Sequence, residues 1–226
     1  MNRSNGWKLN RRERSGIEMS DQVILLHGLW MRAFTLASLR RRLEQAGYAV
    51  DQLDYASVFR SPEVSIELLM RRAQSVSGRN LHFVGHSLGG LIAMQALQRQ
   101  PGLMSGRVVC LGSPLRGSAM ARSIASVPGG GFIVGKHIDI LRRGLERWDG
   151  TQDVGSVAGR LPIGLGFAIG GLSSPHDGTV SVAETELPGL TDHCVTAATH
   201  TGLLFSAEAA EQTVAFLRHG RFTHRD

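Results

Sequence analysis

Short apolar runs alternate with amphipathic segments over the first half of the chain. The runs are built mainly from Val, Ile and Leu, which favours buried strands of a parallel sheet. Such strands are expected at 23–26, 48–55, 81–85 and 107–111. The segments between them place apolar residues at helical spacing, which predicts helices at 34–46, 61–78 and 88–100. This alternation is typical of right-handed βαβ units in a mainly parallel sheet.

The alternation stops between residues 113 and 163, a stretch rich in small residues that we interpret as an insertion. The insertion contains one more amphipathic stripe, formed by Ile138, Leu141, Leu145 and Trp148. Such a stripe usually packs against its own domain, and contact with an acyl chain or a lipid surface is the alternative. Strands at 166–169 and 193–198 are expected next, followed by a helix at 207–219.

The predicted fold class is therefore α/β, with about six mainly parallel strands, helices on both faces and a small lid-like insertion. A chain of 226 residues suits one such domain, which we expect at 21–220. Residues 1–20 are interpreted as a disordered basic leader and 221–226 as a tail.

Composition limits the classes of partner. Hydrophobic residues make up 42% and charged residues 19%, which is typical of a globular protein. The net charge of +6 would suit a nucleic-acid partner. The arginines, however, are scattered over predicted helix faces without interleaved aromatic residues. We therefore expect no nucleic-acid partner.

The two cysteines, Cys110 and Cys194, each fall in a predicted strand. With one strand between them their backbones would lie about 9 to 10 Å apart, beyond the reach of a disulfide, about 7 Å. Two buried thiols suit a reducing compartment, and the basic leader lacks the apolar core of a secretory signal. The longest apolar segment, Leu161 to Leu172, is too short to span a membrane. A cytoplasmic location is expected.

The candidate nucleophile is Ser87, in Gly85-His86-Ser87-Leu88-Gly89. A strand is expected before this Gly-x-Ser-x-Gly pattern and a helix after it, so the serine falls on a sharp turn above the end of the sheet. A glycine-rich βα turn that happens to contain a serine is the alternative. A serine hydroxyl acts as a nucleophile only with a base and an orienting acid nearby. The choice between the two interpretations therefore depends on whether the chain supplies both.

Asp177 and His200 are the expected acid and base. On such a turn the nucleophile is followed along the chain by an acid and then a histidine, each beyond the end of a strand. Asp177 follows the strand expected at 166–169, and His200 follows the strand expected at 193–198. The alternative for Asp177 is a purely structural Asx turn. The competing acids, all further from the strand end, are Glu184, Glu186 and Asp192.

Two backbone N–H groups are needed to stabilise a developing oxyanion. The residue after the nucleophile, Leu88, is expected to supply one, and Leu29 in the loop after the first strand is expected to supply the other. His27, in the same loop, is given a supporting role through hydrogen bonding.

These motifs together resemble bacterial lipases and esterases of the α/β-hydrolase superfamily. The likeness is nearest to small triacylglycerol-lipase-like and GPI-inositol-deacylase-like members and covers residues 21–219. It rests on His27-Gly28, Gly85 to Gly90, Gly112-Ser113-Pro114 with Gly117-Ser118, Asp177 to Val180 and His200-Thr-Gly-Leu-Leu. In those relatives the matching positions are nucleophile, acid, base and oxyanion loop. Trp30 departs from the small residue of many relatives, and Trp30 and Leu115 are the expected substrate contacts.

The expected function is a serine hydrolase that cleaves carboxylic esters through an acyl-enzyme on Ser87. A thioesterase or acyltransferase with the same three residues is the alternative, and a non-catalytic ligand-binding protein on a hydrolase fold is a further one. No metal or organic cofactor is implied. The expected partner is a small-molecule or lipid-like ester, and peripheral contact with a membrane surface stays open.

Overall fold

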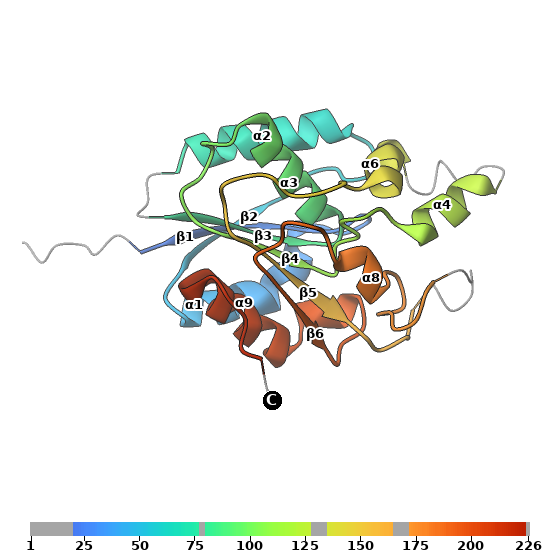
Figure 1. The fold of residues 1–226 in the computed structure, drawn as a ribbon. Helices are drawn as coiled ribbons and strands as arrows, with labels where there is room; N and C mark the ends of the chain where they lie inside the picture. The colour runs from blue at the N-terminus through green and yellow to red at the C-terminus, as the bar shows by residue number, and fades with distance from the viewer. Residues whose placement is uncertain (1–19, 77–79, 128–134, 165–171, 225–226) are drawn as a thin grey trace, which may run out of the picture.

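The computed structural model describes residues 20–76, 80–127, 135–164 and 172–224 and shows a parallel sheet between layers of helices (Figure 1). The strands, in chain order, are β1 Gln22–Leu26, β2 Ala49–Leu53, β3 Leu81–His86, β4 Val108–Leu111, β5 Val154–Gly159 and β6 Asp192–Thr196. Their spatial order is β2-β1-β3-β4-β5-β6, and every neighbouring pair is parallel. The predicted α/β fold class is confirmed.

Helices cover both faces of this sheet. The long helices are α1 Ala37–Gln45, α2 Pro62–Gln74, α3 Leu88–Arg99 and α9 Ala207–His219. The shorter ones are η1 Ala33–Leu36, α4 Ala119–Ser126, η2 Gly135–His137, α6 Ile138–Arg143, α8 Val182–Thr185 and η3 Thr201–Leu204. Figure 1 shows α2 and α3 on one face and α1 and α9 on the other, and a separate buried apolar cluster lies on each side.

The fifth strand is not where the sequence pattern suggested. The strand expected at 166–169 lies outside the described residues, and the structure forms β5 at Val154–Gly159, inside the segment predicted as an insertion. Small residues in β5 explain the error. A Cβ atom on Gly155 would come 2.7 Å from the rings of Phe216 and Phe222, so aromatic side chains occupy the space that larger strand residues would fill.

The insertion between β4 and β5 carries α4, η2 and α6, which project beyond one end of the sheet (Figure 1). Its amphipathic stripe mostly packs on the domain, because Leu145 and Trp148 lie in the buried cluster beside α3. Leu141 belongs to the same cluster and also reaches a cavity described below.

Cys110 in β4 and Cys194 in β6 flank β5, as expected, and both are buried free thiols. Burial raises the pKa of each thiol to about 12, so neither is a reactive thiolate near neutral pH. In the described ranges, no helix combines the length and apolar character needed to cross a membrane.

Candidate active site

Ser87 stands on a strained turn between β3 and α3. Its backbone has φ 54° and ψ −118°, a conformation that side chains disfavour and that is found at functional sites. The two flanking glycines make the turn possible. A Cβ on Gly85 would lie 2.4 Å from the nitrogen of Gly90, and one on Gly89 would lie 2.5 Å from the carbonyl oxygen of Leu26.

The turn fixes Ser87 at the N-terminus of the twelve-residue helix α3. The Ser87 amide donates to the carbonyl of Leu111 in β4 (N–O 2.8 Å), which ties the turn to the sheet. Leu88 follows as the first helical residue, and the first amides of a helix have no partner within it. These amides and the helix dipole favour negative charge beside Ser87.

Asp177 and His200 contact each other directly, although 23 residues separate them. Nδ1 of His200 lies 2.7 Å from Oδ2 of Asp177, and the His200 amide donates to the Asp177 carbonyl (N–O 2.8 Å). The Asp177 side chain is almost fully buried, packed above the end of β5 against Gly159. Since a carboxylate only accepts, Nδ1 carries the proton and Nε2 keeps a free electron pair.

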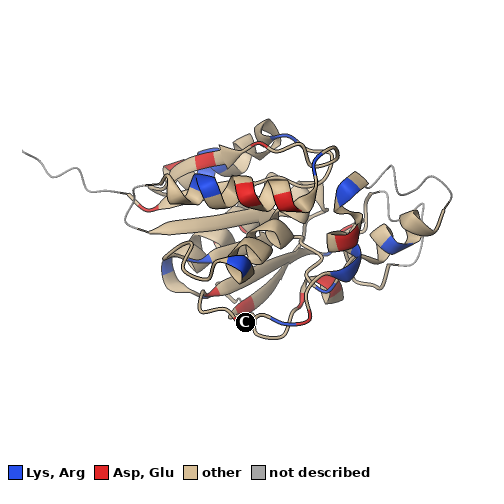
Figure 2. Ribbon diagram, turned by 90° about the horizontal axis from the view of Figure 1, so that it is seen from above, with Lys and Arg blue, Asp and Glu red and all other residues tan. Residues whose placement is uncertain are grey.

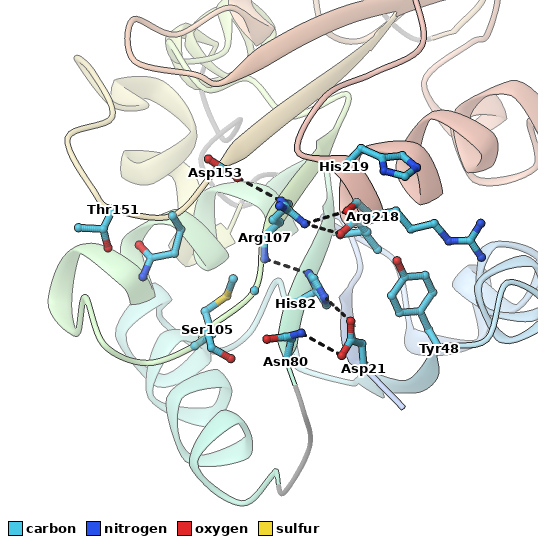
Figure 3. A pocket seen from close by; sticks show the side chains of 14 residues that line it. Asp21, Tyr48, Asn80, His82, Ser105, Arg107, Thr151, Asp153, Arg218 and His219 are labelled. Atoms are coloured by element: carbon cyan, nitrogen blue, oxygen red, sulfur yellow. Dashed lines mark hydrogen bonds and ion pairs between the residues drawn. The ribbon is translucent and has the colours of Figure 1, made fainter. Parts of the chain in front are cut away.

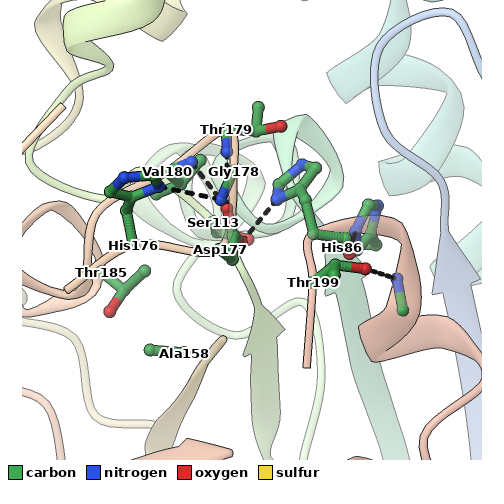
Figure 4. Close-up of polar contacts among 12 residues, drawn as sticks. His86, Ser113, Ala158, His176, Asp177, Gly178, Thr179, Val180, Thr185 and Thr199 are labelled. Atoms are coloured by element: carbon green, nitrogen blue, oxygen red, sulfur yellow. Dashed lines mark hydrogen bonds and ion pairs between the residues drawn. The ribbon is translucent and has the colours of Figure 1, made fainter. Parts of the chain in front are cut away.

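The other oxygen of Asp177 makes an Asx turn. Oδ1 accepts from the amides of Thr179 (2.9 Å) and Val180 (2.7 Å), as Figure 4 shows. The structural interpretation of Asp177 therefore describes Oδ1, while Oδ2 contacts His200. The turn fixes the carboxylate so that its second oxygen points at His200.

The competing acids are engaged elsewhere. Glu184 forms a capping box with Ser181 at the start of α8 and also accepts from the amide of Ala119. Asp192 accepts from the amides of its neighbour and of Phe222, and Glu186 is exposed.

His27 supports the loop after β1, in agreement with its expected role. Its ring stacks on Tyr55 with centroids 4.1 Å apart, and its Nδ1 lies 2.9 Å from the carbonyl of Gly28. The Tyr55 hydroxyl donates to the His27 carbonyl, and the Tyr55 amide donates to Nε2 of His27 at 3.3 Å. Burial lowers the pKa of His27, so the ring is neutral and can hold both contacts.

The sequence favours a packing or hydrogen-bonding role for His86, and the structure shows its hydrogen-bond partner. Its Nε2 donates to the carbonyl of His200 (3.0 Å), and the two rings lie 4.7 Å apart. Burial lowers the pKa of His86 to about 3, so it is neutral, and its buried Nδ1 has no hydrogen-bond partner among the described residues. A histidine directly before the nucleophile was the available signal, but only the fold shows that it holds the backbone of His200.

Ser87, His200, Leu29 and Trp30 line one cavity of about 270 Å³ at the carboxyl ends of the strands. Its walls are largely apolar, and the loop after β1 and helix α4 contribute most of them, including Met31, Met120, Ala121 and Ile124, with Leu141 of α6 and Val180. α4 belongs to the insertion that the sequence analysis expected to be lid-like, although its own residues showed no distinctive pattern. Trp30 is 62% exposed at φ 60°, and it stands at the mouth. Leu115 is instead buried in the core, and its neighbours Pro114 and Ser118 reach the cavity.

A larger cavity, about 740 Å³, lies at the opposite edge of the sheet (Figure 3). Its polar side chains are largely paired with one another or with backbone groups. Arg107 contacts Asp153 (Nε–Oδ2 3.1 Å) and donates to the carbonyl of Leu217 (2.8 Å), and His82 lies 3.7 Å from the carboxylate of Asp21. The serine, histidine and buried acid gather at the smaller cavity, which is therefore the candidate active site. Within the described parts of the chain, no three His, Cys, Asp or Glu side chains cluster to hold a metal ion.

Residues 23–168 match the model of the alpha/beta hydrolase family. Curated proteins give no match. Among solved structures, the mature form of Bacillus licheniformis lipase BlEst2 aligns with a TM-score of 0.71 and 17% identity, over 92% of this chain and 94% of the other.

Two further solved structures are similar. The metagenomic carboxyl esterase MGS0156 aligns with a TM-score of 0.65 and 18% identity, over 80% of this chain and 65% of the other. The Vlm2 thioesterase domain aligns with a TM-score of 0.58 and 12% identity, over 90% and 94%. At these identities the likeness concerns the fold, whereas the family model runs from Val23 in β1 through β5 and includes the turn that carries Ser87. The chain belongs to the alpha/beta hydrolase family.

Proposed function

We propose that the protein is a serine hydrolase that cleaves carboxylic esters at the cavity beside Ser87. The observation that carries the proposal is the buried Asp177 carboxylate, which is fixed by two backbone amides and lies 2.7 Å from Nδ1 of His200. This contact leaves Nε2 of His200 as a proton acceptor in the cavity that Ser87 lines.

In the proposed reaction, Oγ of Ser87 attacks the ester carbonyl carbon while Nε2 of His200 takes its proton. The amides of Leu29 and Leu88 stabilise the negative charge that develops on the carbonyl oxygen. The C–O bond to the alcohol then breaks, and His200 returns the proton to that alcohol. Water, deprotonated by the same histidine, attacks the acyl-enzyme and releases the carboxylic acid and Ser87.

The cavity favours a small apolar acyl group. About 270 Å³ is below the range of 300 to 1,000 Å³ typical of drug-sized ligands. Met120, Ile124 and Leu141 offer no charged partner for a polar acyl chain, and Trp30 restricts the mouth. Short-chain esters should therefore react faster than long-chain ones.

The test begins with labelling by a fluorophosphonate probe, which reacts with activated serines. The wild type should be labelled and the Ser87→Ala variant should not, while Ser113→Ala, which removes a second buried serine nearby, should keep the label. Full labelling of Ser87→Ala would reject Ser87 as the nucleophile. Rates on an acyl-length series of p-nitrophenyl esters, beside matched thioesters, then test the substrate class, and faster turnover of thioesters would favour a thioesterase.

A further inference from the structure

The most exposed apolar side chains gather at one edge of the molecule. The four with the largest exposed fractions are Phe59 (77%), Phe34 (74%), Ile163 (72%) and Trp30 (62%). With three more, they form what we call the apolar rim: Trp30, Phe34, Phe59, Val127, Leu161, Ile163 and Phe205. The other large apolar side chains exposed in the described residues are Val64 and Leu68 on α2 and Val195 on β6.

Topology places the whole rim around the candidate active site. Its members follow the carboxyl ends of β1, β2, β4, β5 and β6. The remaining strand, β3, carries Ser87 at the same end. Because all six strands are parallel, these ends share one edge of the sheet, where the cavity opens. The opposite edge has no rim member among the described residues.

The segments that carry most of the rim are also basic. Residues 27–36, 54–61, 112–144 and 160–164 hold the exposed cations Arg32, Arg60, Arg116, Arg122, Lys136, Arg142, Arg143 and Arg160. The same segments hold two acids, Asp54 and Asp139, and Arg32 already pairs with Asp54 at 2.5 Å. With Glu63 and Glu208, in the first turns of α2 and α9, and Glu184, which lies 4.0 Å from Arg122, these eight cations still outnumber five acids. Figure 2 shows blue bands on the helices where the insertion projects, with red bands among them.

We propose that this edge docks on an anionic lipid surface, with the apolar rim in the interface and the basic side chains against the headgroups. Aromatic side chains beside Arg and Lys are typical of protein segments that lie at such interfaces. The rim is divided among five loops around an opening, so it offers separate anchors that a fluid surface can accommodate. A protein partner would require a continuous complementary patch. The docked molecule presents its cavity mouth to the membrane, whatever reaction the cavity performs.

The test is sedimentation of the full chain with phosphatidylcholine vesicles that contain phosphatidylglycerol, and with phosphatidylcholine alone. We expect binding to the anionic vesicles that weakens with added salt. The Arg60→Gln/Arg160→Gln variant should bind about 25-fold more weakly, from about fivefold for each cation near the surface. The Phe34→Ser/Phe59→Ser variant should also lose binding.

Matched controls use exposed residues away from this edge. Leu68→Ser on α2 and Arg41→Gln on α1 should bind as the wild type does, and melting temperatures confirm that every variant is folded. The proposal is overturned if anionic vesicles do not bind the protein. It is equally overturned if the rim variants bind them like the wild type, since the contact would then lie elsewhere in the chain. Because binding is measured without a substrate, the result is independent of the ester hydrolysis proposed above.

Discussion

Substitution of Asp177 by asparagine separates the two duties of its side chain. The asparagine oxygen can still accept from the amides of Thr179 and Val180, so the turn is retained. Its NH₂ group then faces Nδ1 of His200, where the wild type has an acceptor 2.7 Å away. An NH₂ group donates, so Nδ1 must accept and the ring proton moves to Nε2. His200 then has no free electron pair to take the proton of Ser87.

The expected loss is large for the reaction and small for the fold. The same substitution in a Ser-His-Asp triad lowers kcat about 10⁴-fold, which corresponds to about 5 kcal/mol of transition-state stabilisation. For the fold, the three hydrogen bonds of the Asp177 carboxylate become bonds to a neutral amide, at about 1 kcal/mol each, or about 3 kcal/mol in all.

The assay compares kcat on p-nitrophenyl butyrate and the melting temperature of the wild type, Asp177→Asn and Glu184→Gln. Glu184 is a matched control, since its carboxylate is also buried and also accepts from backbone amides. We expect Glu184→Gln to retain kcat within about threefold, because it removes no contact to His200. A kcat for folded Asp177→Asn within tenfold of the wild type would refute the assigned role of Asp177.

Four further variants test other parts of the structure. Gly89→Ala should destabilise the fold by about 1 to 3 kcal/mol, because its Cβ would lie 2.5 Å from a carbonyl of β1. Gly102→Ala, whose Cβ would meet nothing within 4 Å, should leave the thermal midpoint unchanged. His86→Phe removes the donor to the carbonyl of His200 and should lower kcat about tenfold with little change in KM. Equal kcat values for the wild type and His86→Phe would exclude a positioning role for His86. Burial lowers the pKa of His137 to about 4, so stability present above pH 6.5 should be lost as the pH falls toward 4. A His137→Gln variant should show a flatter dependence of melting temperature on pH, and an unchanged slope would contradict this assignment.

The candidate site could be predicted because its residues are fixed by local chemistry and chain order. Gly85 and Gly89 identify the turn by the absence of side chains, and the structure shows atoms within 2.6 Å of where those side chains would begin. Parallel strands then bring the segments of Asp177 and His200 to the edge that carries Ser87, whatever the connections between them.

The parts that sequence did not predict depend on tertiary packing. The β5 strand has the sequence Val-Gly-Ser-Val-Ala-Gly, and the rings of Phe216 and Phe222 fill the space beside Gly155 that a larger strand residue would occupy. Hydrophobicity along the chain therefore could not distinguish it from the insertion. The sequence also does not show in which direction a loop side chain points. Leu115 was therefore expected at the cavity, but it lies in the core.

The division of labour between the insertion and the strand ends has a consequence for protein engineering. Met120, Ala121 and Ile124 of α4 form much of the cavity wall, while Asp177 and His200 are held by contacts that involve no residue of α4. A library of substitutions on α4 should therefore shift which substrates are accepted while leaving the reacting groups in place. Because of the same separation, related sequences could diverge in substrate specificity through α4 while Asp177 and His200 keep their arrangement.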